Sequence, residues 1–368
     1  MAERLLVRRL WAAERPWRLL PLWLSLVPAS ALYRVALGVR TGWWRLMKQQ
    51  AGPRVIAVGN LVVGGSGKTP FTLYLARRLC EMGLKAAIVG SGYRGRARRA
   101  GLPLLVSDGS RLLATPEEAG DEAVMMAKSF AGPLAVARRR IQAIALLEKV
   151  ARPDVVVLDD AYQHVRLARD VNLLLVDGER GFGNGWLLPA GPMREPLGAA
   201  RRADAVVLVN GQTAEPPPGL KPRLAAKFAP RPMLHAHLAP RSLVYPIEGR
   251  WQEQPLGFAG RRVLALSAVA DGRRFHRMLR ELEADLVAVL DYPDHHNYTL
   301  SDWRDILSAA RHADLIVTTE KDLVKLERFS FTRGALCALR VGVSLDGDER
   351  TLLEMVLGSE RARAVSDL

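Results

Sequence analysis

A glycine-rich stretch has the residue types and spacing of a phosphate-binding loop. An apolar segment, Val55–Val58, leads into Gly64-Gly65-Ser66-Gly67-Lys68-Thr69-Pro70, and a helical pattern follows at Phe71–Met82. Glycines let backbone N–H groups turn toward phosphate oxygens, and the N-terminus of the following helix adds partial positive charge. In such a loop Lys68 reaches the β- and γ-phosphates, and the Thr69 hydroxyl binds Mg²⁺. The stretch therefore predicts nucleoside triphosphate binding, although Val62 stands where the strict pattern has its first glycine.

Two carboxylates follow a second apolar segment, Val155–Leu158. Asp159 and Asp160 are in the position of a strand-end carboxylate that holds Mg²⁺ directly or through water. A turn or a helix cap is the structural alternative. Gln163 and His164 come within one turn and could approach the same site, and for His164 a structural role is equally compatible with the sequence.

Three further groups of polar residues admit either a structural or a chemical role. Asp121, in Gly120-Asp121-Glu122, is most simply an N-cap, and otherwise a carboxylate that accepts a proton. Asp294-His295-His296 could bind metal, act as a base or be a solvated loop. Thr319-Glu320-Lys321-Asp322 could cap a helix or contact substrate. A basic cluster at 94–99 could be a solvated loop or could hold an anionic acceptor.

The elements that must position these residues alternate between strand and helix. From 54 to 209 the sequence predicts strands at Val55–Val58, Ala86–Val89, Leu134–Ala137, Val155–Leu158, Leu173–Val176 and Ala205–Val209, with helices at Phe71–Met82, Glu117–Phe130 and Arg139–Val150. Continuous apolar strands alternating with helices are typical of a parallel α/β sheet covered on both faces.

A proline-rich stretch separates this region from a second one. Residues 211–250 hold eight of the 22 prolines, and we expect a linker there with two extended segments, Leu224–Phe228 and Leu243–Tyr245. Strands and helices then resume between 262 and 318. We therefore predict a membrane-associated segment at 1–50, a P-loop domain at 51–210, the linker at 211–250 and a smaller α/β domain at 251–368.

The first 50 residues carry much of the positive charge. They hold eight Arg and one Lys against two Glu, which gives +7 of a formal net charge of +15, and they include five Trp. Basic residues mixed with Trp and Leu are typical of a helix that lies in lipid headgroups. Because the sequence contains no nucleic-acid-binding motif, we expect an anionic membrane surface as partner rather than nucleic acid, and no obligate protein partner.

How this segment meets the membrane stays open. Fifteen uncharged residues lie between Arg18 and Arg34, with Pro28 among them. A spanning helix needs about 20 apolar residues, so a monotopic anchor is favoured over a true span or a soluble helix. A signal peptide is disfavoured because the triphosphate-binding loop requires a cytosolic nucleotide pool.

Several of these motifs together resemble one family. Gly59-Asn60, the loop to Pro70, and Leu158-Asp159-Asp160-Ala161-Tyr162-Gln163-His164 resemble the signature of the tetraacyldisaccharide 4′-kinases. Leu188-Pro189-Ala190-Gly191-Pro192-Met193-Arg194-Glu195-Pro196, then Asp294-His295 and Thr319-Glu320-Lys321-Asp322, follow in the family's order. The chain departs from the pattern at Val62, Ser66 and Ala161, and in Gly90-Ser91-Gly92-Tyr93-Arg94-Gly95.

The resemblance implies a cytoplasmic-face enzyme of the bacterial inner membrane that makes lipid IVA for lipopolysaccharide. It would transfer a phosphoryl group from ATP, with Mg²⁺, to the 4′-hydroxyl of a tetraacyl-glucosamine disaccharide 1-phosphate, the lipid A precursor. Carried over by motif, 64–70 bind nucleotide, Thr69, Asp159 and Asp160 bind metal, and Asp121 and His295 form the catalytic pair. Gln163, His164, Arg194, Glu320 and Lys321 would belong to the site. The alternative from another class is a membrane-associated P-loop NTPase switch without a lipid acceptor.

Overall fold

The structure is a computed structural model that describes residues 6–7, 9–12, 17–211, 219–258, 260–269, 272–331 and 335–358. The chain divides into two compact units. Unit 1 comprises Met1–Gly90, Arg139–Leu238 and Val343–Leu368, and unit 2 comprises Ser91–Arg138 and Ala239–Gly342. Two of the four boundaries between the units fall within strands, namely β8 (Met233–Ile247) and β13 (Leu336–Leu345).

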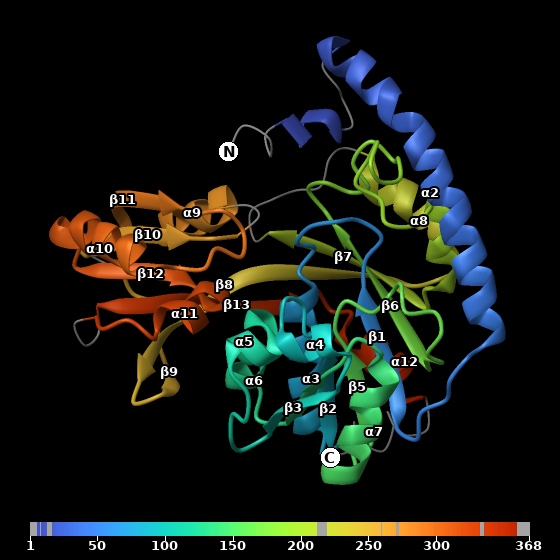
Figure 1. Cartoon of the computed structure of the whole chain (residues 1–368), viewed down its shortest axis with the longest axis horizontal. Helices are drawn as coiled ribbons and strands as arrows, with labels where there is room; N and C mark the ends of the chain where they lie inside the picture. The colour runs from blue at the N-terminus through green and yellow to red at the C-terminus, as the bar shows by residue number, and fades with distance from the viewer. Residues whose placement is uncertain are drawn as a thin grey trace. The chain divides into compact units, whose positions relative to one another are not determined.

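Unit 1 is built on a parallel sheet with strand order β8-β7-β6-β1-β5-β2 (Figure 1). Its strands are β1 (Arg54–Gly59), β2 (Ala86–Gly90), β5 (Val155–Leu158), β6 (Val171–Asp177), β7 (Ala205–Gly211) and the first part of β8 (Met233–Ile247). Nearly every residue of β1, β2, β5, β6 and β7 is buried, which explains why these strands read as continuous apolar runs. The carboxyl ends of β1 and β5 are neighbours, with Ala57 opposite Leu158.

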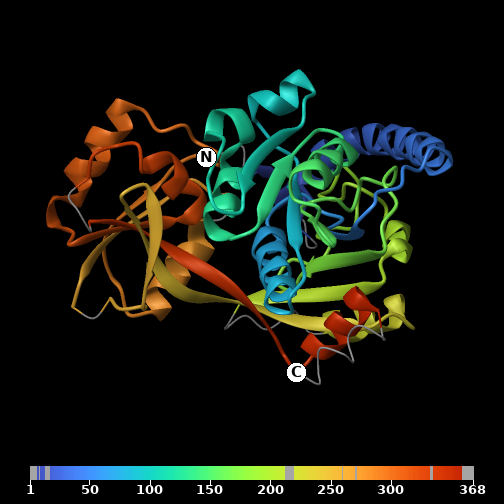
Figure 2. The same ribbon diagram turned by 90° about the horizontal axis from the view of Figure 1, so that it is seen from below.

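The helical elements of unit 1 are η1 (Trp17–Leu19), α2 (Leu20–Leu46), α3 (Lys68–Glu81), α7 (Arg140–Val150), η2 (Leu197–Arg202), α8 (Leu220–Phe228) and α12 (Glu349–Leu357). The C-terminal helix α12 belongs to this unit (Figure 2). Arg54 of β1 donates to the carbonyl oxygen of Val356 in α12, and the Tyr74 hydroxyl of α3 donates to Glu349 at 2.7 Å. These bonds fasten α12 to the first strand of the sheet and to α3.

Unit 2 contains a second group of parallel strands and a smaller helical insertion. Strands β10 (Arg262–Ser267), β11 (Asp285–Asp291), β12 (Leu315–Thr319) and β13 (Leu336–Leu345) pair in parallel in the order β11-β10-β12-β13. Two antiparallel pairs join β9 (Arg250–Gln254) to β8 and β3 (Leu104–Asp108) to β4 (Pro133–Val136). The helical elements are α4 (Arg96–Ala100), α5 (Pro116–Ala119), α6 (Asp121–Ser129), α9 (Gly272–Glu281), α10 (Leu300–Ala309), η3 (Ala310–His312) and α11 (Glu320–Leu326).

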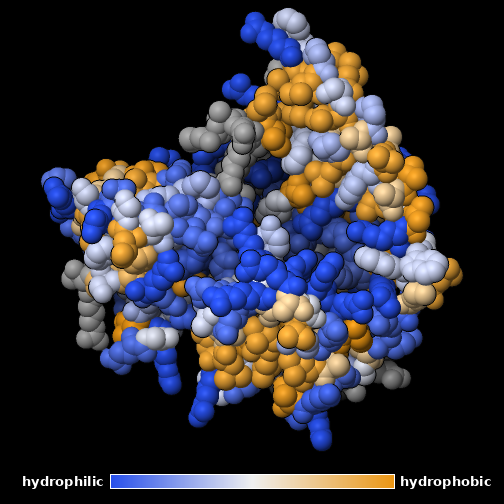
Figure 3. Space-filling view, in the orientation of Figure 1, coloured by the Kyte–Doolittle hydropathy of each residue, from blue (hydrophilic) through white to orange (hydrophobic). Residues whose placement is uncertain are grey.

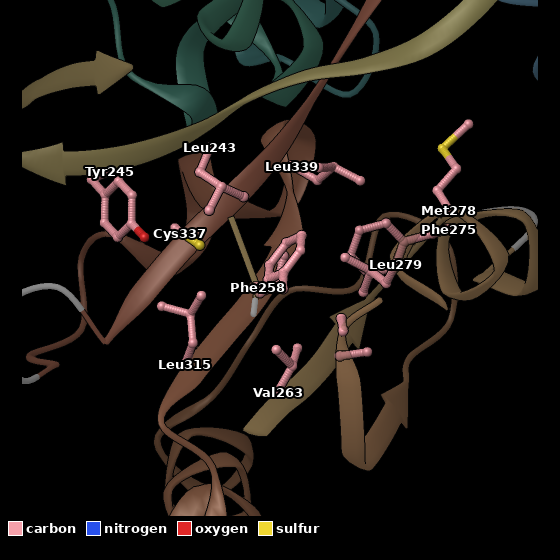
Figure 4. Packing of buried hydrophobic residues seen from close by; sticks show 13 residues of the cluster. Leu243, Tyr245, Phe258, Val263, Phe275, Met278, Leu279, Leu315, Cys337 and Leu339 are labelled. Carbon is pink, nitrogen blue, oxygen red and sulfur yellow. The ribbon is translucent and has the colours of Figure 1, made fainter. Parts of the chain in front are cut away.

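One face of this second group of strands is covered by α9. Figure 4 shows Val263, Leu315, Cys337 and Leu339 from the strands gathered with Phe275, Met278 and Leu279 of α9. Phe258 and Leu243 close the same cluster. These side chains form part of the core of unit 2, and the loops after β11 and β12 begin at the carboxyl ends of the strands around it.

The predicted α/β class with a mostly parallel sheet is confirmed, and each strand predicted up to Val209 overlaps an observed strand. The extended segment predicted at Leu224–Phe228 is wrong, because these residues form the last turns of α8. Leu224 and Phe228 are four residues apart and both are buried, as on the inner face of a helix. Residues 212–218 of the predicted linker lie outside the described residues.

Two further differences concern residues 91–138. The single helix predicted at Glu117–Phe130 is two helices, α5 and α6, because Gly120 between them has φ of 90°. Residues 91–138 also belong to unit 2, where Lys128 Nζ pairs with Glu327 at 2.7 Å and Ser129 contacts Glu320 at 3.1 Å. The domain ranges expected from the sequence, 51–210, 211–250 and 251–368, stay a prediction.

The apolar N-terminal segment forms one long helix that continues through Pro28. Trp17–Leu46 is the one helical stretch of the described chain that is long and apolar enough to cross a membrane, which by itself is weak evidence of a membrane helix. Apolar side chains are exposed along α2 (Figure 3). One side of the helix is nevertheless docked on unit 1, since the Ser30 hydroxyl donates to the carbonyl of Leu187 at 2.5 Å and the Tyr33 hydroxyl to that of Arg194 at 3.0 Å.

Candidate active site

The glycine-rich loop joins the carboxyl end of β1 to the N-terminus of α3 in unit 1. Gly67 is the N-cap of α3 with φ of 71°, a conformation that favours glycine. A Cβ atom at Gly67 would also meet a Val209 methyl at 3.0 Å. At Gly64 and Gly65, in contrast, a Cβ atom would meet no atom within 4 Å. The loop is thus packed at its base and open at its exposed turn, as a cradle for an anion must be.

Two side chains fix the shape of this loop from inside. The Asn60 amide donates to the Ser66 hydroxyl at 2.8 Å, and both residues are buried. The Gln163 amide donates to the carbonyl oxygen of Asn60 at 2.7 Å. Ser66, predicted to bind nucleotide, therefore has a side chain that stabilises the loop itself, and its contribution to binding would come from the backbone.

Lys68 is the first residue of α3, and its ammonium lies over the loop. Nζ donates to the carbonyl oxygen of Gly64 at 3.1 Å and is 3.8 Å from Oδ1 of Asp160. The ammonium therefore lies beside both the loop and the end of β5. Thr69 and Pro70 follow in the first turn of α3, where Thr69 is half-buried and its backbone N–H points along the helix axis.

The two carboxylates after β5 have different surroundings. Asp159 is 5% exposed, and its Oδ1 accepts from the Thr72 hydroxyl at 3.0 Å. Asp160 is half-buried and has φ of 45°. Burial raises the pKa of Asp160, but the charges of Lys68 and Arg194 more than offset this and hold the pKa at about 2. Asp160 is therefore an anion at any physiological pH.

Arg194 connects this carboxylate to the loop. Its Nη1 lies 3.1 and 3.0 Å from the two oxygens of Asp160 and 3.4 Å from Oε1 of Gln163. Its Nη2 donates to Oδ1 of Asn60 at 3.0 Å, and its Nε donates to the carbonyl of Val62 at 3.1 Å. The sequence-predicted Gln163, Asp160 and Arg194 are thus brought together around Asn60. For His164 the structure gives a backbone N–H that donates to the carbonyl of Ala161 at 2.9 Å, and its role stays a prediction.

The residues predicted to bind metal suit Mg²⁺ in their chemistry. Thr69, Asp159 and Asp160 offer only hard oxygen donors. Within the part of the chain that the structure describes, no group of three or more His, Cys, Asp or Glu side chains is placed to hold a metal ion. Mg²⁺ commonly takes one or two carboxylates together with substrate phosphates and water rather than a full protein cage. The donor set fits an ion that arrives with a nucleotide.

Unit 2 brings together Asp121 and His295, which are 174 residues apart. His295 Nδ1 lies 3.2 Å from Oδ2 of Asp121. Asp121 is the first residue of α6 rather than its N-cap, which is Gly120. At Gly120 a Cβ atom would lie 2.3 Å from the carbonyl oxygen of Tyr93, so glycine is required for this close approach. The structural alternative of Asp121 as an N-cap is therefore wrong.

The pKa of Asp121 is depressed although its side chain is buried. Burial alone would raise the pKa, but the hydrogen bond with His295 and the charges of Lys325 and Lys321 lower it to about 2. Lys325 Nζ is 3.7 Å from Oδ2 of Asp121. Asp121 is therefore ionised at neutral pH, as a proton acceptor must be before it reacts.

The first turns of α11 supply two lysines to this group. Lys321 Nζ is 3.0 Å from His295 Nε2 and 3.2 Å from both Asp294 and Glu122. Glu320 does not join them, because its Oε1 accepts from Arg340 Nε at 2.7 Å and from Ser129 at 3.1 Å. We call Asp121, Glu122, Asp294, His295, Lys321 and Lys325 the unit 2 cluster.

Sequence reasoning did not single out every residue that the structure places at these sites. Asn60 and Glu122 lie within recognised motifs but had no role assigned, and Thr72 and Lys325 were missed. For Lys325 the sequence did contain a signal, because this residue follows Lys321 by one helical turn. Of the basic cluster, Arg94 contacts the unit 2 cluster, with its Nη1 donating to the carbonyl oxygen of His295 at 3.0 Å.

Comparison with known proteins identifies a family. Residues 22–359 match the family described as tetraacyldisaccharide-1-P 4′-kinase. The tetraacyldisaccharide 4′-kinase of Syntrophus aciditrophicus is 36% identical over 369 residues, covering 95% of this chain and 97% of that protein. That of Pelobacter propionicus is 41% identical over 313 residues, covering 82% of each. A crystal structure of LpxK from Aquifex aeolicus in complex with ATP aligns with a TM-score of 0.74 and 29% identity, covering 94% of this chain and 99% of that one.

Proposed function

The chain belongs to the tetraacyldisaccharide 4′-kinase family, as its motifs predicted, and we propose that it transfers the γ-phosphoryl group of ATP to the 4′-hydroxyl of a tetraacyl-glucosamine disaccharide 1-phosphate. The product would be a 4′-phosphorylated lipid A precursor, lipid IVA. The similarity to a kinase solved with ATP supports the choice of nucleotide.

The residues of unit 1 would hold ATP, the phosphoryl donor. The backbone of 64–67 and the N-terminus of α3 would bind phosphate oxygens, and Lys68 would move from the Gly64 carbonyl to the β- and γ-phosphates. Arg194 would keep Asp160 ionised and oriented. Mg²⁺, held by Thr69 and the Asp159–Asp160 pair, would neutralise charge on the phosphates when bound.

The Asp121–His295 contact is the observation that carries the proposal of a transferase rather than a switch. Nucleotide hydrolysis by a switch needs a positioned water, whereas a sugar hydroxyl is a poor nucleophile whose proton must be taken as the new bond to phosphorus forms. A buried, ionised carboxylate that is oriented by an imidazole has the chemistry for that step. Asp121 would accept the proton, and His295 would orient the carboxylate.

The exposed apolar residues of α2 support a place at the membrane. The acyl chains of the acceptor lie in a bilayer, so the enzyme must work at its surface. We infer that α2 lies in the headgroup region of the cytoplasmic face of the inner membrane, with Arg and Trp side chains among anionic lipids.

The test is phosphoryl transfer from γ-labelled ATP to the tetraacyl disaccharide 1-phosphate in detergent micelles with Mg²⁺. We expect label in the lipid, with a rate that falls at least about 100-fold in Asp121→Ala and falls in His295→Ala. ATP affinity, measured separately, should stay near that of the parent protein in both variants. Release of free phosphate without labelled lipid would overturn the kinase proposal and favour the NTPase switch.

A further inference from the structure

Lys321 makes three polar contacts within the unit 2 cluster. Its ammonium lies 3.0 Å from His295 Nε2, 3.2 Å from Oδ1 of Asp294 and 3.2 Å from Oε1 of Glu122. An ammonium carries three N–H donors and no acceptor. The three contacts therefore match its full donor capacity, and they fix its position between one ring nitrogen and two carboxylates.

This arrangement determines the protonation of the imidazole. Because Lys321 can only donate, His295 Nε2 must be the acceptor and carries no proton. The remaining nitrogen, Nδ1, then carries the proton and donates it to Oδ2 of Asp121 at 3.2 Å. A doubly protonated imidazole would place an N–H against an ammonium at 3.0 Å, which is repulsive.

The charged groups around the imidazole of His295 indicate what Lys321 contributes. Helix α6 presents Asp121 and Glu122, the loop before the ring presents Asp294, and α11 presents Lys321 and Lys325. Arg94 faces the backbone of His295, and the Tyr93 ring packs edge-on at 5.5 Å. Without Lys321 the imidazole would face three carboxylates and one ammonium, a setting that favours a second proton on the ring.

The contacts on Asp121 leave one oxygen for chemistry. Within the described chain, its hydrogen bond with His295 and its ion pair with Lys325 both go to Oδ2. Oδ1 therefore keeps its capacity to accept a proton. The Lys321 ammonium stays charged, because Glu122 and Asp294 raise its pKa against the lowering effect of burial.

We propose that Lys321 is a positioning residue that locks His295 as the neutral Nδ1–H tautomer, so that Oδ2 of Asp121 is held by the imidazole and Oδ1 accepts the proton of the acceptor hydroxyl. This inference rests on the proposed function. In the step, the O–H bond breaks as the hydroxyl oxygen bonds to the γ-phosphorus and the bond to the β–γ bridging oxygen breaks. The proton goes to Oδ1 of Asp121, and ADP leaves with the electron pair.

The test combines imidazole nitrogen NMR with kinetics. In protein labelled with ¹⁵N-histidine and assigned by His295→Gln, we expect His295 to show a protonated Nδ1 and an unprotonated Nε2 from pH 8 to pH 6. In Lys321→Met we expect a doubly protonated ring as the pH falls. The kcat of that variant should fall about 10- to 100-fold at pH 6 and less at pH 8, with an unchanged KM for ATP.

Two further variants serve as controls. Lys321→Arg keeps a cationic donor and should restore the tautomer and the flat pH profile. Lys128→Met removes a comparably buried ammonium, paired with Glu327 in the same unit, and should change neither.

Three results would overturn the inference. One is an Nε2–H tautomer of His295 in the parent protein, a result that does not depend on the folding of Lys321→Met. Another is a Lys321→Met protein with the parental tautomer and pH profile, and the third is an equal effect of Lys128→Met. A parent protein that transfers no phosphoryl group would overturn the proposed function instead, while the NMR result would still decide the tautomer.

Discussion

The guanidinium of Arg194 holds both carboxylate oxygens of Asp160, at 3.1 and 3.0 Å from Nη1. The same guanidinium donates to Asn60 and to the carbonyl of Val62, at either end of the segment that leads into the glycine-rich loop. Arg194 therefore fixes the strand-end carboxylate and the loop relative to each other. The sequence supplied Arg194 only through a family motif, and the structure gives it this physical role.

Arg194→Met should reduce kcat/KM for ATP about 10- to 100-fold. The change removes one of the positive charges that hold the pKa of Asp160 low. It also removes the hydrogen bond that Arg194 donates to the carbonyl oxygen of Val62. Arg194→Lys should recover only part of the loss, because a lysine cannot reproduce the planar fork of donors. Steady-state kinetics over a range of ATP and Mg²⁺ concentrations measure both effects.

The matched control is Arg78→Met. Arg78 also pairs with a carboxylate of unit 1, Glu81 at 2.9 Å, but its side chain is 40% exposed and lies at the other end of α3. Its loss should leave kcat/KM within about twofold of the parent, since exposed pairs contribute little. Equal effects of the two substitutions would remove the basis for a special role of Arg194.

Thr72→Val should weaken the proposed Mg²⁺ site by removing a hydrogen bond to Asp159. The Thr72 hydroxyl is fully buried and donates to Oδ1 of Asp159 at 3.0 Å. Removing the donor while keeping the shape costs about 1–3 kcal/mol, because a buried carboxylate oxygen loses a partner. We expect a lower melting temperature and a higher Mg²⁺ concentration for half-maximal activity. Thr72→Ser, which keeps the hydroxyl, should preserve the Mg²⁺ dependence, and a valine variant with parental Mg²⁺ dependence would contradict the assignment of Asp159.

The fold could be predicted largely from apolar runs. Val55–Val58, Val155–Leu158 and Leu173–Val176 are continuous and buried, so their strand character and parallel pairing follow from the sequence. The division into units could not be predicted, because it depends on side-chain pairs far apart in sequence. Lys128 with Glu327, and Ser129 with Glu320, fasten α6 to unit 2.

The site shows the same limit. Residue types and spacing indicated the loop, the strand-end carboxylates and, through the family's motifs, the Asp121–His295 pair. They could not separate Glu320 from Lys321, which are adjacent in the sequence and lie on different faces of α11. Nor could they show that Ser66 turns inward to Asn60, because this bond depends on the positive φ values that shape the loop.

Acid should destabilise unit 2 through Asp121. Its pKa is about 2 in the folded protein against an ordinary value of 3.8, so between these values the unfolded chain binds more protons. The resulting stabilisation, about 2 kcal/mol, is fully present above roughly pH 4 and is lost as the pH falls toward 2. The difference in free energy of unfolding between the parent protein and Asp121→Asn should shrink by about 1 kcal/mol from pH 7 to pH 3.

Urea unfolding followed by circular dichroism measures this difference. Asp305→Asn, on the exposed side of α10, controls for the removal of a carboxylate as such and should show no comparable pH dependence. A constant difference between the parent and Asp121→Asn over the same range would mean that the cationic neighbours do not depress the pKa of Asp121.

The exposed face of α2 leads to a prediction about the membrane. Leu32, Val35, Val39 and Trp43 recur at helical spacing and are between 59% and 72% exposed. The docked side of the helix is fixed by Trp23 and Ser30, whose side chains donate to the carbonyls of Ala190 and Leu187. A helix held in this way would lie along the surface of a bilayer with its free face in the headgroup and acyl boundary.

The double change Leu32→Ser/Val39→Ser should therefore weaken binding to vesicles that contain anionic lipid by at least about 10-fold, because each side chain loses apolar burial worth about 1 kcal/mol or more. Phosphoryl transfer to acceptor dispersed in detergent should stay near the parental rate, since neither residue touches the sites of unit 1 or the unit 2 cluster. Leu300→Ser, a comparably exposed leucine on α10, is the control and should bind vesicles as the parent does. Sedimentation with vesicles measures the affinity. Parental binding by the double variant would mean that this face does not contact the membrane, and an equal loss in Leu300→Ser would point to general surface hydrophobicity instead.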